Sequence, residues 1–229
     1  MRFPQGGWSD GHLTRPTPTV KLDGMITLFT SPTGNGHRVS ILLEELGLEY
    51  QVVRIGFEPG AARPPEFVAA SPMGKIPAII DHDATDGTAV MLCESLAIAQ
   101  YLVEKAGRLR PGTAEGRARA AEWGAIVVTG FASPFAGIFF ARRIDAEAHV
   151  GLIAKYFADL DIAFAALEGR LAASAYLAGD EFSYADALAI PIVNTAKMFA
   201  IDLTPYPAIR RWRDVVVARP GVQAGFAVP

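Results

Sequence analysis

The first strong periodic signal begins at Met25 and predicts a strand, a helix and a second strand. Residues 26–29 form a short apolar run typical of a β-strand, and residues 50–55 form another. Between them apolar side chains recur at helical spacing until Gly47 ends the pattern: Val39, Leu42, Leu43 and Leu46. A helix that joins two strands favours a right-handed crossover, so we expect these two strands to be parallel.

The next segment predicts two more strands and another helix. A proline-containing loop at 59–65 leads into a short helical turn at 66–70. Strand patterns then cover residues 76–80 and 89–92. Residues 94–105 are helical, with apolar side chains along their inner side: Leu96, Ile98, Ala99 and Leu102.

Beyond residues 107–112, which have the composition of a linker, only helical patterns remain. Residues 114–143 predict helices with a break near Pro134, because proline lacks the amide hydrogen that a helix interior needs. A long helix follows, with one apolar face: Leu152, Tyr156, Leu160, Ala163, Leu167 and Leu171.

The last two predicted helices have clear boundaries. Ser183 and Asp186 stand at capping-box spacing at the start of one helix, with Asp in place of the usual Glu. The other covers residues 206–218, and we expect Pro220 to stop it.

These patterns predict an α/β N-terminal domain followed by an all-α C-terminal domain. The first domain covers residues 25–106, a linker covers 107–112, and the helical domain covers 113–229. Residues 1–24 are rich in Gly, Pro and Thr without periodicity, so we expect an N-terminal arm.

Composition narrows the functional classes. The chain has 229 residues, 51% hydrophobic and 20% charged, which permits a sizeable buried core. Its net charge is −3, and a nucleic-acid-binding protein usually carries a basic excess, so we expect no nucleic acid as partner. The single cysteine, Cys93, excludes a disulfide framework and a cysteine-based zinc site, and it fits a reducing compartment.

One stretch requires a decision about membranes. Residues 123–141 contain no charged side chain and reach the length of a short membrane span, roughly 17–25 residues. Three glycines and Pro134 interrupt them, so we expect a buried, kinked helix pair rather than a membrane span. Residues 1–24 lack the continuous apolar core of a signal peptide, so a cytoplasmic protein is expected.

Several familiar catalytic motifs are incomplete. The glycines at 34 and 36 precede a helix, but Val39 stands where a dinucleotide-binding motif needs its third glycine. No Gly-Lys-Ser/Thr phosphate loop occurs, and Ser133 lacks the glycine that a nucleophile elbow requires. The histidines do not pair at metal-ligand spacing, so we expect no metal: His12, His37, His82 and His149.

The turn at residues 33–36 is a candidate anion site. It leads into a helix N-terminus, where unpaired peptide N–H groups stabilise negative charge. Thr33 adds a hydroxyl donor and Asn35 an amide donor. The alternative is an ordinary helix cap and glycine turn.

Two further features could bind a peptide-like ligand. A cis bond before Pro77 would expose the N–H and C=O groups of Ile76, whereas an ordinary trans proline at a sheet edge would not. At another helix start, Ser95 could hold a carboxylate and Glu94 an ammonium group, or the pair could simply cap the helix.

Together these segments resemble cytosolic glutathione transferases. The resemblance runs from Met25 to about Pro220 and rests on four stretches: Ser-Pro-Thr-Gly-Asn-Gly-His-Arg at 31–38, Pro-Glu-Phe at 65–67, Ser-Pro-Met-Gly-Lys-Ile-Pro-Ala-Ile at 71–79 and Glu-Ser-Leu-Ala-Ile at 94–98. The first stretch is similar to the nu class and to the related fungal nitrogen regulator. The resemblance implies a thioredoxin-like first domain, glutathione as cosubstrate, a homodimer, and glutathione-dependent disulfide reduction with weak transferase activity.

The resemblance also implies roles around the glutathione sulfur. Thr33 and Asn35 match the residues that this subgroup presents to the sulfur, and Ser31 is the rival, as in classes that use serine. Lys155 stands where a helical-domain arginine is expected, and the loop at 61–63 lacks the subgroup's Gln or His.

Other matches imply how the rest of glutathione is held. The binding residues include Lys75, Ile76 and Pro77, with the backbone of Ile76 pairing with the cysteinyl part. Glu94 and Ser95 would bind the γ-glutamyl group.

Three functions remain open from the sequence. The first is disulfide reduction, in which a stabilised glutathione thiolate attacks a disulfide sulfur; a free thiol with a pKa of ~8.5 is only slightly ionised at pH 7. The second is conjugation to apolar electrophiles, with four aromatic residues lining a second pocket: Phe131, Phe135, Phe139 and Phe140. The third is a non-enzymatic glutathione-binding regulatory module. The helix-start turn has no cysteine, and we expect Cys93 to fill a gap in the core.

Overall fold

The computed structural model describes residues 25–229 apart from residues 59 and 62, so the expected arm at 1–24 lies outside the described residues. Its N-terminal part contains a four-stranded sheet in the order β2-β1-β3-β4. The strands are β1 (Ile26–Thr30), β2 (Tyr50–Arg54), β3 (Ala78–Asp81) and β4 (Val90–Cys93). β1 and β2 are parallel, as predicted from the crossover, whereas β3 is antiparallel to both β1 and β4.

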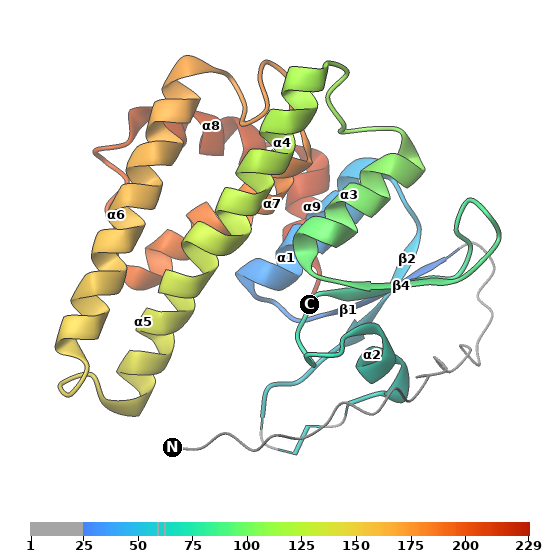
Figure 1. Ribbon diagram of the computed structural model, residues 1–229, viewed down its shortest axis with the longest axis horizontal. Helices are drawn as coiled ribbons and strands as arrows, with labels where there is room; N and C mark the ends of the chain where they lie inside the picture. Colours follow the sequence, from blue (N-terminus) through green and yellow to red (C-terminus); the bar gives the residue numbers. More distant parts are fainter. Residues whose placement is uncertain (1–24, 59, 62) are drawn as a thin grey trace, which may run out of the picture.

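Helices cover both faces of this sheet (Figure 1). On one side lie α1 (Gly34–Leu46) and α3 (Ser95–Ala106), and on the other lies α2 (Pro65–Ala70). The alternation along β1 explains this: Leu28 belongs to the core shared with the helices, whereas Phe29 packs with Phe67 of α2. The expected strand at 76–80 begins two residues later, at Ala78.

The second part is helical throughout the described residues after Ala106. Its elements are α4 (Ala114–Ile126), the π-helical segment η1 (Val127–Phe131), α5 (Ala132–Asp145), α6 (Val150–Ala173), α7 (Tyr184–Thr195), the 3-10 segment η2 (Ala196–Phe199), α8 (Pro207–Val217) and α9 (Pro220–Ala227). α7 is the central helix, and its residues from Tyr184 to Val193 are all buried. The expected capping box is present, since Ser183 and Asp186 bond reciprocally at its start.

Two expectations about proline were wrong. Pro134 does not break the helix, which runs from Ala114 to Asp145, because the wider π-turns of η1 just before it absorb the missing amide hydrogen. Pro220 does not end the helical region either. It occupies the first turn of α9, where a missing N–H costs nothing.

α9 returns the chain to the first domain, and Figure 1 shows the C-terminus beside β1 and α1. The approach is close because Gly225 has no side chain; an added Cβ would lie 2.4 Å from the Cα of Ile41. Ser40 donates a hydrogen bond to the Gly225 carbonyl (2.7 Å), and Arg219 forms two bonds with Glu45. α1 is therefore held on its outer side by the end of the chain.

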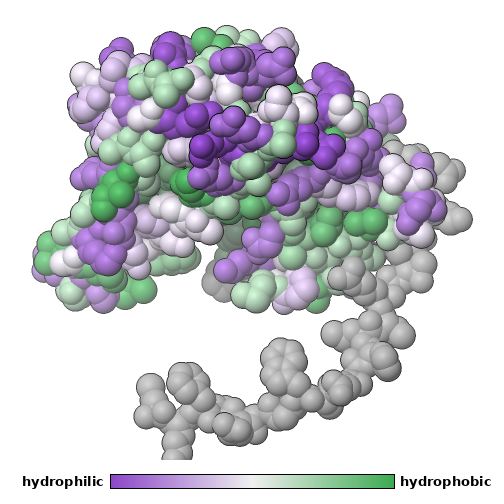
Figure 2. All heavy atoms as spheres, turned by 45° about the horizontal axis from the view of Figure 1, so that its top comes forward, coloured by the Kyte–Doolittle hydropathy of each residue, from purple (hydrophilic) through white to green (hydrophobic). Residues whose placement is uncertain are grey.

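The surface carries apolar side chains near the ends of α5 and α6, seen as green spheres at the left of Figure 2. The most exposed are Phe139, Phe140, Ile144, Val150 and Ile162. Among the described residues, the stretch Ala114–Asp145 is long and apolar enough to cross a membrane. A single stretch of this kind also occurs as a core helix in soluble proteins, so it is weak support for a membrane span.

Candidate functional site

The strand register brings the three sequence features to one edge of the sheet. Phe29 of β1 pairs with Ala78 of β3, and Ala78 pairs with Cys93 of β4. The end of β1, the start of β3 and the end of β4 therefore meet. The turn at 33–36, the dipeptide at 76–77 and the dipeptide at 94–95 follow or precede these positions directly, so they surround one site.

The turn before α1 leaves hydrogen-bond donors free. Thr33 is the N-cap, and its hydroxyl oxygen accepts from the Gly36 N–H (3.2 Å), which leaves the hydroxyl proton to donate elsewhere. Among the described residues, the N–H groups of Gly34 and Asn35 have no hydrogen-bond partner, and the exposed Asn35 side chain has none either. This arrangement can hold an anion at the helix N-terminus.

Ser31 differs from its neighbours in this turn. It is buried, with 3% of its surface exposed, and its hydroxyl donates a short hydrogen bond to the Ile55 carbonyl. A hydroxyl has one proton to donate, so Ser31 has none left for a second acceptor. Together with Pro32, Thr33 and residues 54–58, it lines a pocket of about 430 Å³.

The bond between Ile76 and Pro77 is cis, as one of the two sequence alternatives expected. The backbone N–H and C=O of Ile76 have no hydrogen-bond partner among the described residues. The preceding residue, Lys75, is fixed by Ser71, whose hydroxyl accepts from its N–H (3.0 Å) and donates to its C=O (2.7 Å). The exposed Lys75 side chain is free to reach a ligand.

The third feature is the start of α3. Glu94 has φ 70° and ψ 114°, a conformation that costs a non-glycine residue about 1–3 kcal/mol. Such strain is frequent where a side chain must be aimed at a ligand, and the Glu94 side chain is exposed. Ser95 begins the helix and is buried. Cys93 packs beside the small cluster that includes Phe67, which agrees with its expected place in the core.

Comparison with known proteins identifies the family. The model "Glutathione S-transferase, N-terminal domain" matches residues 25–104, and "Glutathione S-transferase, C-terminal domain" matches residues 138–220. The chain is 34% identical to the disulfide-bond oxidoreductase YfcG of Escherichia coli over 86% of this chain and 92% of that protein. The chain belongs to the glutathione S-transferase family.

Solved structures of the family agree with this membership. A glutathione transferase family member from Pseudomonas fluorescens, solved with two glutathione bound, has a TM-score of 0.82 at 28% identity and covers 92% of this chain and 96% of its own. A glutathione transferase from Pseudomonas putida, solved with one glutathione disulfide per subunit, has a TM-score of 0.81 at 27% identity over 92% and 94%. The resemblance seen in the sequence and its thioredoxin-like plus helical architecture are thus confirmed. The protein is an enzyme of the glutathione S-transferase family.

Sequence reasoning missed the residue that links the transferase's two parts at this site. Arg38 of α1 has 2% of its surface exposed and donates to the Ser95 hydroxyl oxygen (3.4 Å). It also donates to the carbonyls of Leu188 in α7 (3.1 Å) and Val127 in η1 (3.3 Å). Because Ser95 accepts from Arg38, its own hydroxyl proton is left for a ligand.

The charge of Arg38 is unusual for its position. Burial lowers the pKa of its guanidinium to about 10, against the opposing charge of Glu94. All three of its hydrogen-bond acceptors are uncharged, so a carboxylate bound at Ser95 would supply the counter-charge. The sequence signal was available: Arg38 stands four residues before Leu42 on the apolar stripe of α1, where a charge must be buried.

The structure does not bring Lys155 to the other candidates. It lies on α6, and Figure 1 shows α4 and α5 between α6 and the first domain. Its ammonium is exposed and pairs with Asp159 on the same helix (2.5 Å). A contact between Lys155 and glutathione stays a prediction.

The expected aromatic lining of a second pocket was wrong. Phe131 and Phe135 are buried and pack on Phe164 and on Phe199. Phe139 and Phe140 are about half exposed and contact each other. The four rings therefore do not form one lining, because the helix turns them to different sides. Among the described residues no group of three or more His, Cys, Asp or Glu side chains could hold a metal.

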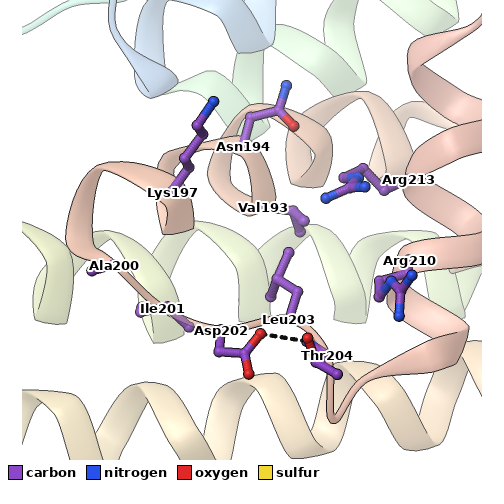
Figure 3. A pocket seen from close by; sticks show the side chains of 10 residues that line it. All are labelled: Val193, Asn194, Lys197, Ala200, Ile201, Asp202, Leu203, Thr204, Arg210 and Arg213. Atoms are coloured by element: carbon purple, nitrogen blue, oxygen red, sulfur yellow. Dashed lines mark hydrogen bonds between the residues drawn. The ribbon is translucent and has the colours of Figure 1, made fainter.

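A different pocket lies in the helical part of the transferase, and Figure 3 shows it from close by. Its volume is about 800 Å³, and it lies between the end of α7, η2, the following loop and α8. The lining residues are Val193, Asn194, Lys197, Ala200, Ile201, Asp202, Leu203, Thr204, Arg210 and Arg213.

Proposed function

We propose that this protein is a glutathione-dependent disulfide reductase that stabilises the glutathione thiolate at the turn before α1. The observation that carries the proposal is the set of free donors there. Thr33 keeps its hydroxyl proton, Asn35 keeps its side-chain amide, and two helix N–H groups are unpaired. Donors fixed in place before reaction favour the charged thiolate over the thiol.

The remaining features fit the rest of glutathione. The unpaired backbone groups of Ile76 suit the peptide groups of the cysteinyl residue, and Lys75 beside them suits the glycine carboxylate. Ser95, with the N-terminus of α3, suits the α-carboxylate of the γ-glutamyl group, and Glu94 suits its ammonium. Arg38 supports Ser95 from behind.

The chemistry then follows from thiol–disulfide exchange. The bound glutathione thiolate attacks one sulfur of a disulfide, a new S–S bond forms, and the other sulfur leaves as a thiolate. A second glutathione thiolate attacks the mixed disulfide, which releases glutathione disulfide and the second substrate thiol. The turn carries no cysteine, so the exchange runs between ligands. The name of the relative YfcG, a disulfide-bond oxidoreductase, supports this reaction over conjugation.

Parallel assays with a glutathione mixed disulfide and an aryl halide test the proposal. We expect turnover of the mixed disulfide to exceed conjugation of the aryl halide. Asn35→Ala should lower disulfide turnover about tenfold to a hundredfold, below the full loss typical of an oxyanion donor, because sulfur accepts weaker hydrogen bonds.

Ser31→Ala is the matched control in the same turn, and we expect a loss of less than threefold. Loss of turnover in Ser31→Ala with Asn35→Ala near wild type would assign a serine-type transferase instead. Absence of glutathione binding by calorimetry at millimolar concentration would overturn the proposal entirely.

A further inference from the structure

The end of α7 lies against the turn that holds the candidate thiolate site. A Cβ added at Gly34 would meet the hydroxyl oxygen of Thr195 at 2.9 Å and the carbonyl of Pro191 at 3.6 Å. The pocket of Figure 3 begins at this end of α7, since Asn194 lines it next to Thr195. Pocket and turn are therefore neighbours.

Lys197 is the cation on this side of the pocket. It lies in η2, two residues after Thr195, so its backbone is only roughly 4 Å further along the helix axis. Its side chain is exposed and has no hydrogen bond or ion pair among the described residues. In Figure 3 its ammonium points towards the pale blue ribbon of the N-terminal part rather than towards the pocket floor.

The rest of the lining favours an anion with a short apolar body. Arg210 and Arg213 add positive charge on the α8 side, and Arg213 is partly neutralised by Asp214 (2.9 Å). Asp202 is the acidic side chain of the lining, and it accepts the Thr204 N–H (2.8 Å), drawn as a dashed line in Figure 3. The apolar floor consists of Val193, Ile201 and Leu203.

We propose that this pocket binds the departing half of the disulfide substrate and that Lys197 selects a carboxylate there. The inference rests on the proposed function and names its substrate class: disulfides whose departing thiol carries a carboxylate. When the S–S bond breaks, the electron pair stays on the departing sulfur, so that half gains a second negative charge before water protonates it. Lys197 and the arginines stabilise this charge in an otherwise open pocket.

A pair of matched disulfides tests the selection. 3,3′-Dithiodipropionate and bis(2-hydroxyethyl) disulfide share the same chain around sulfur and differ in carboxylate against hydroxyl. We expect wild type to have a lower KM for the dicarboxylate. Lys197→Gln should raise that KM about threefold to tenfold with kcat unchanged and leave the neutral disulfide unaffected, and Lys197→Arg should restore it.

Two controls separate a local charge from a general one. Arg119→Gln removes a positive charge from α4, where Arg119 is exposed and pairs with Glu122 (2.8 Å), and should change neither KM. Added salt should erase the preference for the dicarboxylate in wild type. Equal KM values for the two disulfides in wild type, or a Lys197→Gln effect on both, would overturn the inference.

Failure of the reductase proposal gives a different result. If neither disulfide is turned over, octanedioate, the carbon analogue of the dicarboxylate, is titrated calorimetrically into wild type and Lys197→Gln. Weaker binding to the variant would support the pocket without the reaction. Equal binding to both proteins, or none to wild type, would refute the pocket.

Discussion

Gly36 is the position where the geometry of the anion-binding turn can be disturbed most locally. A Cβ added there would lie 2.1 Å from the Ser31 carbonyl oxygen and 2.5 Å from the Thr30 hydroxyl oxygen, whereas ordinary contacts begin near 3.4 Å. The Ser31 carbonyl cannot yield easily, because it accepts the Thr33 N–H at 2.7 Å. Gly36→Ala must therefore move the turn by about 1 Å.

The cost has two parts. Forcing a carbon into a filled space costs about 1–3 kcal/mol, and losing the Thr33 cap on the Gly36 N–H costs about 1 kcal/mol more. For a chain of this size, each kcal/mol lowers Tm by about 2–4 °C, so we expect a fall of roughly 5–15 °C. A 1 Å displacement of the donors can cost up to about a hundredfold in rate, so activity should fall even where the variant is folded.

The assay compares Tm and kcat/KM for disulfide reduction in Gly36→Ala and in the matched variant Gly151→Ala. Gly151 is the second residue of α6, and an added Cβ there meets nothing within 4 Å. That variant should be as stable as wild type or more stable by about 0.5–1 kcal/mol, with unchanged activity. If Gly36→Ala matched wild type in both measurements, the close packing of the turn would be refuted.

Three other predictions concern stability and assembly. Asp186→Asn should lower the unfolding free energy by about 2–4 kcal/mol, because the amide cannot accept the two bonds from Ser183, and denaturant unfolding would show no change if this network were dispensable. Burial opposes ionisation of Asp81, but the hydrogen bonds from Lys105 and Tyr101 hold the pKa of Asp81 below its ordinary value. This stabilisation is present above the unfolded pKa and is lost as pH falls through the folded pKa. Wild type should therefore lose stability below about pH 4, and Asp81→Asn should show a weaker acid dependence; equal pH profiles would contradict this. We also expect a homodimer, because apolar side chains are exposed along α5 and α6, and a sedimentation mass near 24.4 kDa at micromolar concentration would contradict it.

Local patterns in the sequence predicted most of the first part of the fold. The alternation along residues 26–29 and the helical spacing after Val39 each reflect a single surface buried against one core, and both elements formed as expected. The convergence of the turn, Ile76 and Ser95 could not be read from spacing alone. It depends on the register that places Phe29, Ala78 and Cys93 side by side.

The prolines show why element boundaries were harder. A proline removes one amide hydrogen whatever its context, but the consequence depends on the backbone around it. Before Pro134 the helix widens into η1, and at Pro220 the proline simply starts a new helix.

Charged residues at the junction of the two parts were the hardest to predict. Arg38 is buried because carbonyls from α7 and η1 happen to face it, and these come from positions 89 and 150 residues away. Lys197 lies near the turn only because the end of α7 packs on Gly34. Such contacts depend on how the helices pack together, which no local pattern contains.

The pKa of the bound glutathione thiol tests the central claim most directly. It can be followed by the ultraviolet absorbance of the thiolate during a pH titration of the complex. Hydrogen bonds to a charged group contribute about 1.5–3 kcal/mol, and one pKa unit corresponds to about 1.4 kcal/mol, so two donors to a soft anion should lower the pKa by at least one unit from ~8.5. Thr33→Ala and Asn35→Ala should each raise it again, and Ser31→Ala should leave it unchanged. A bound thiol with the pKa of free glutathione, or a rise in Ser31→Ala alone, would contradict the account.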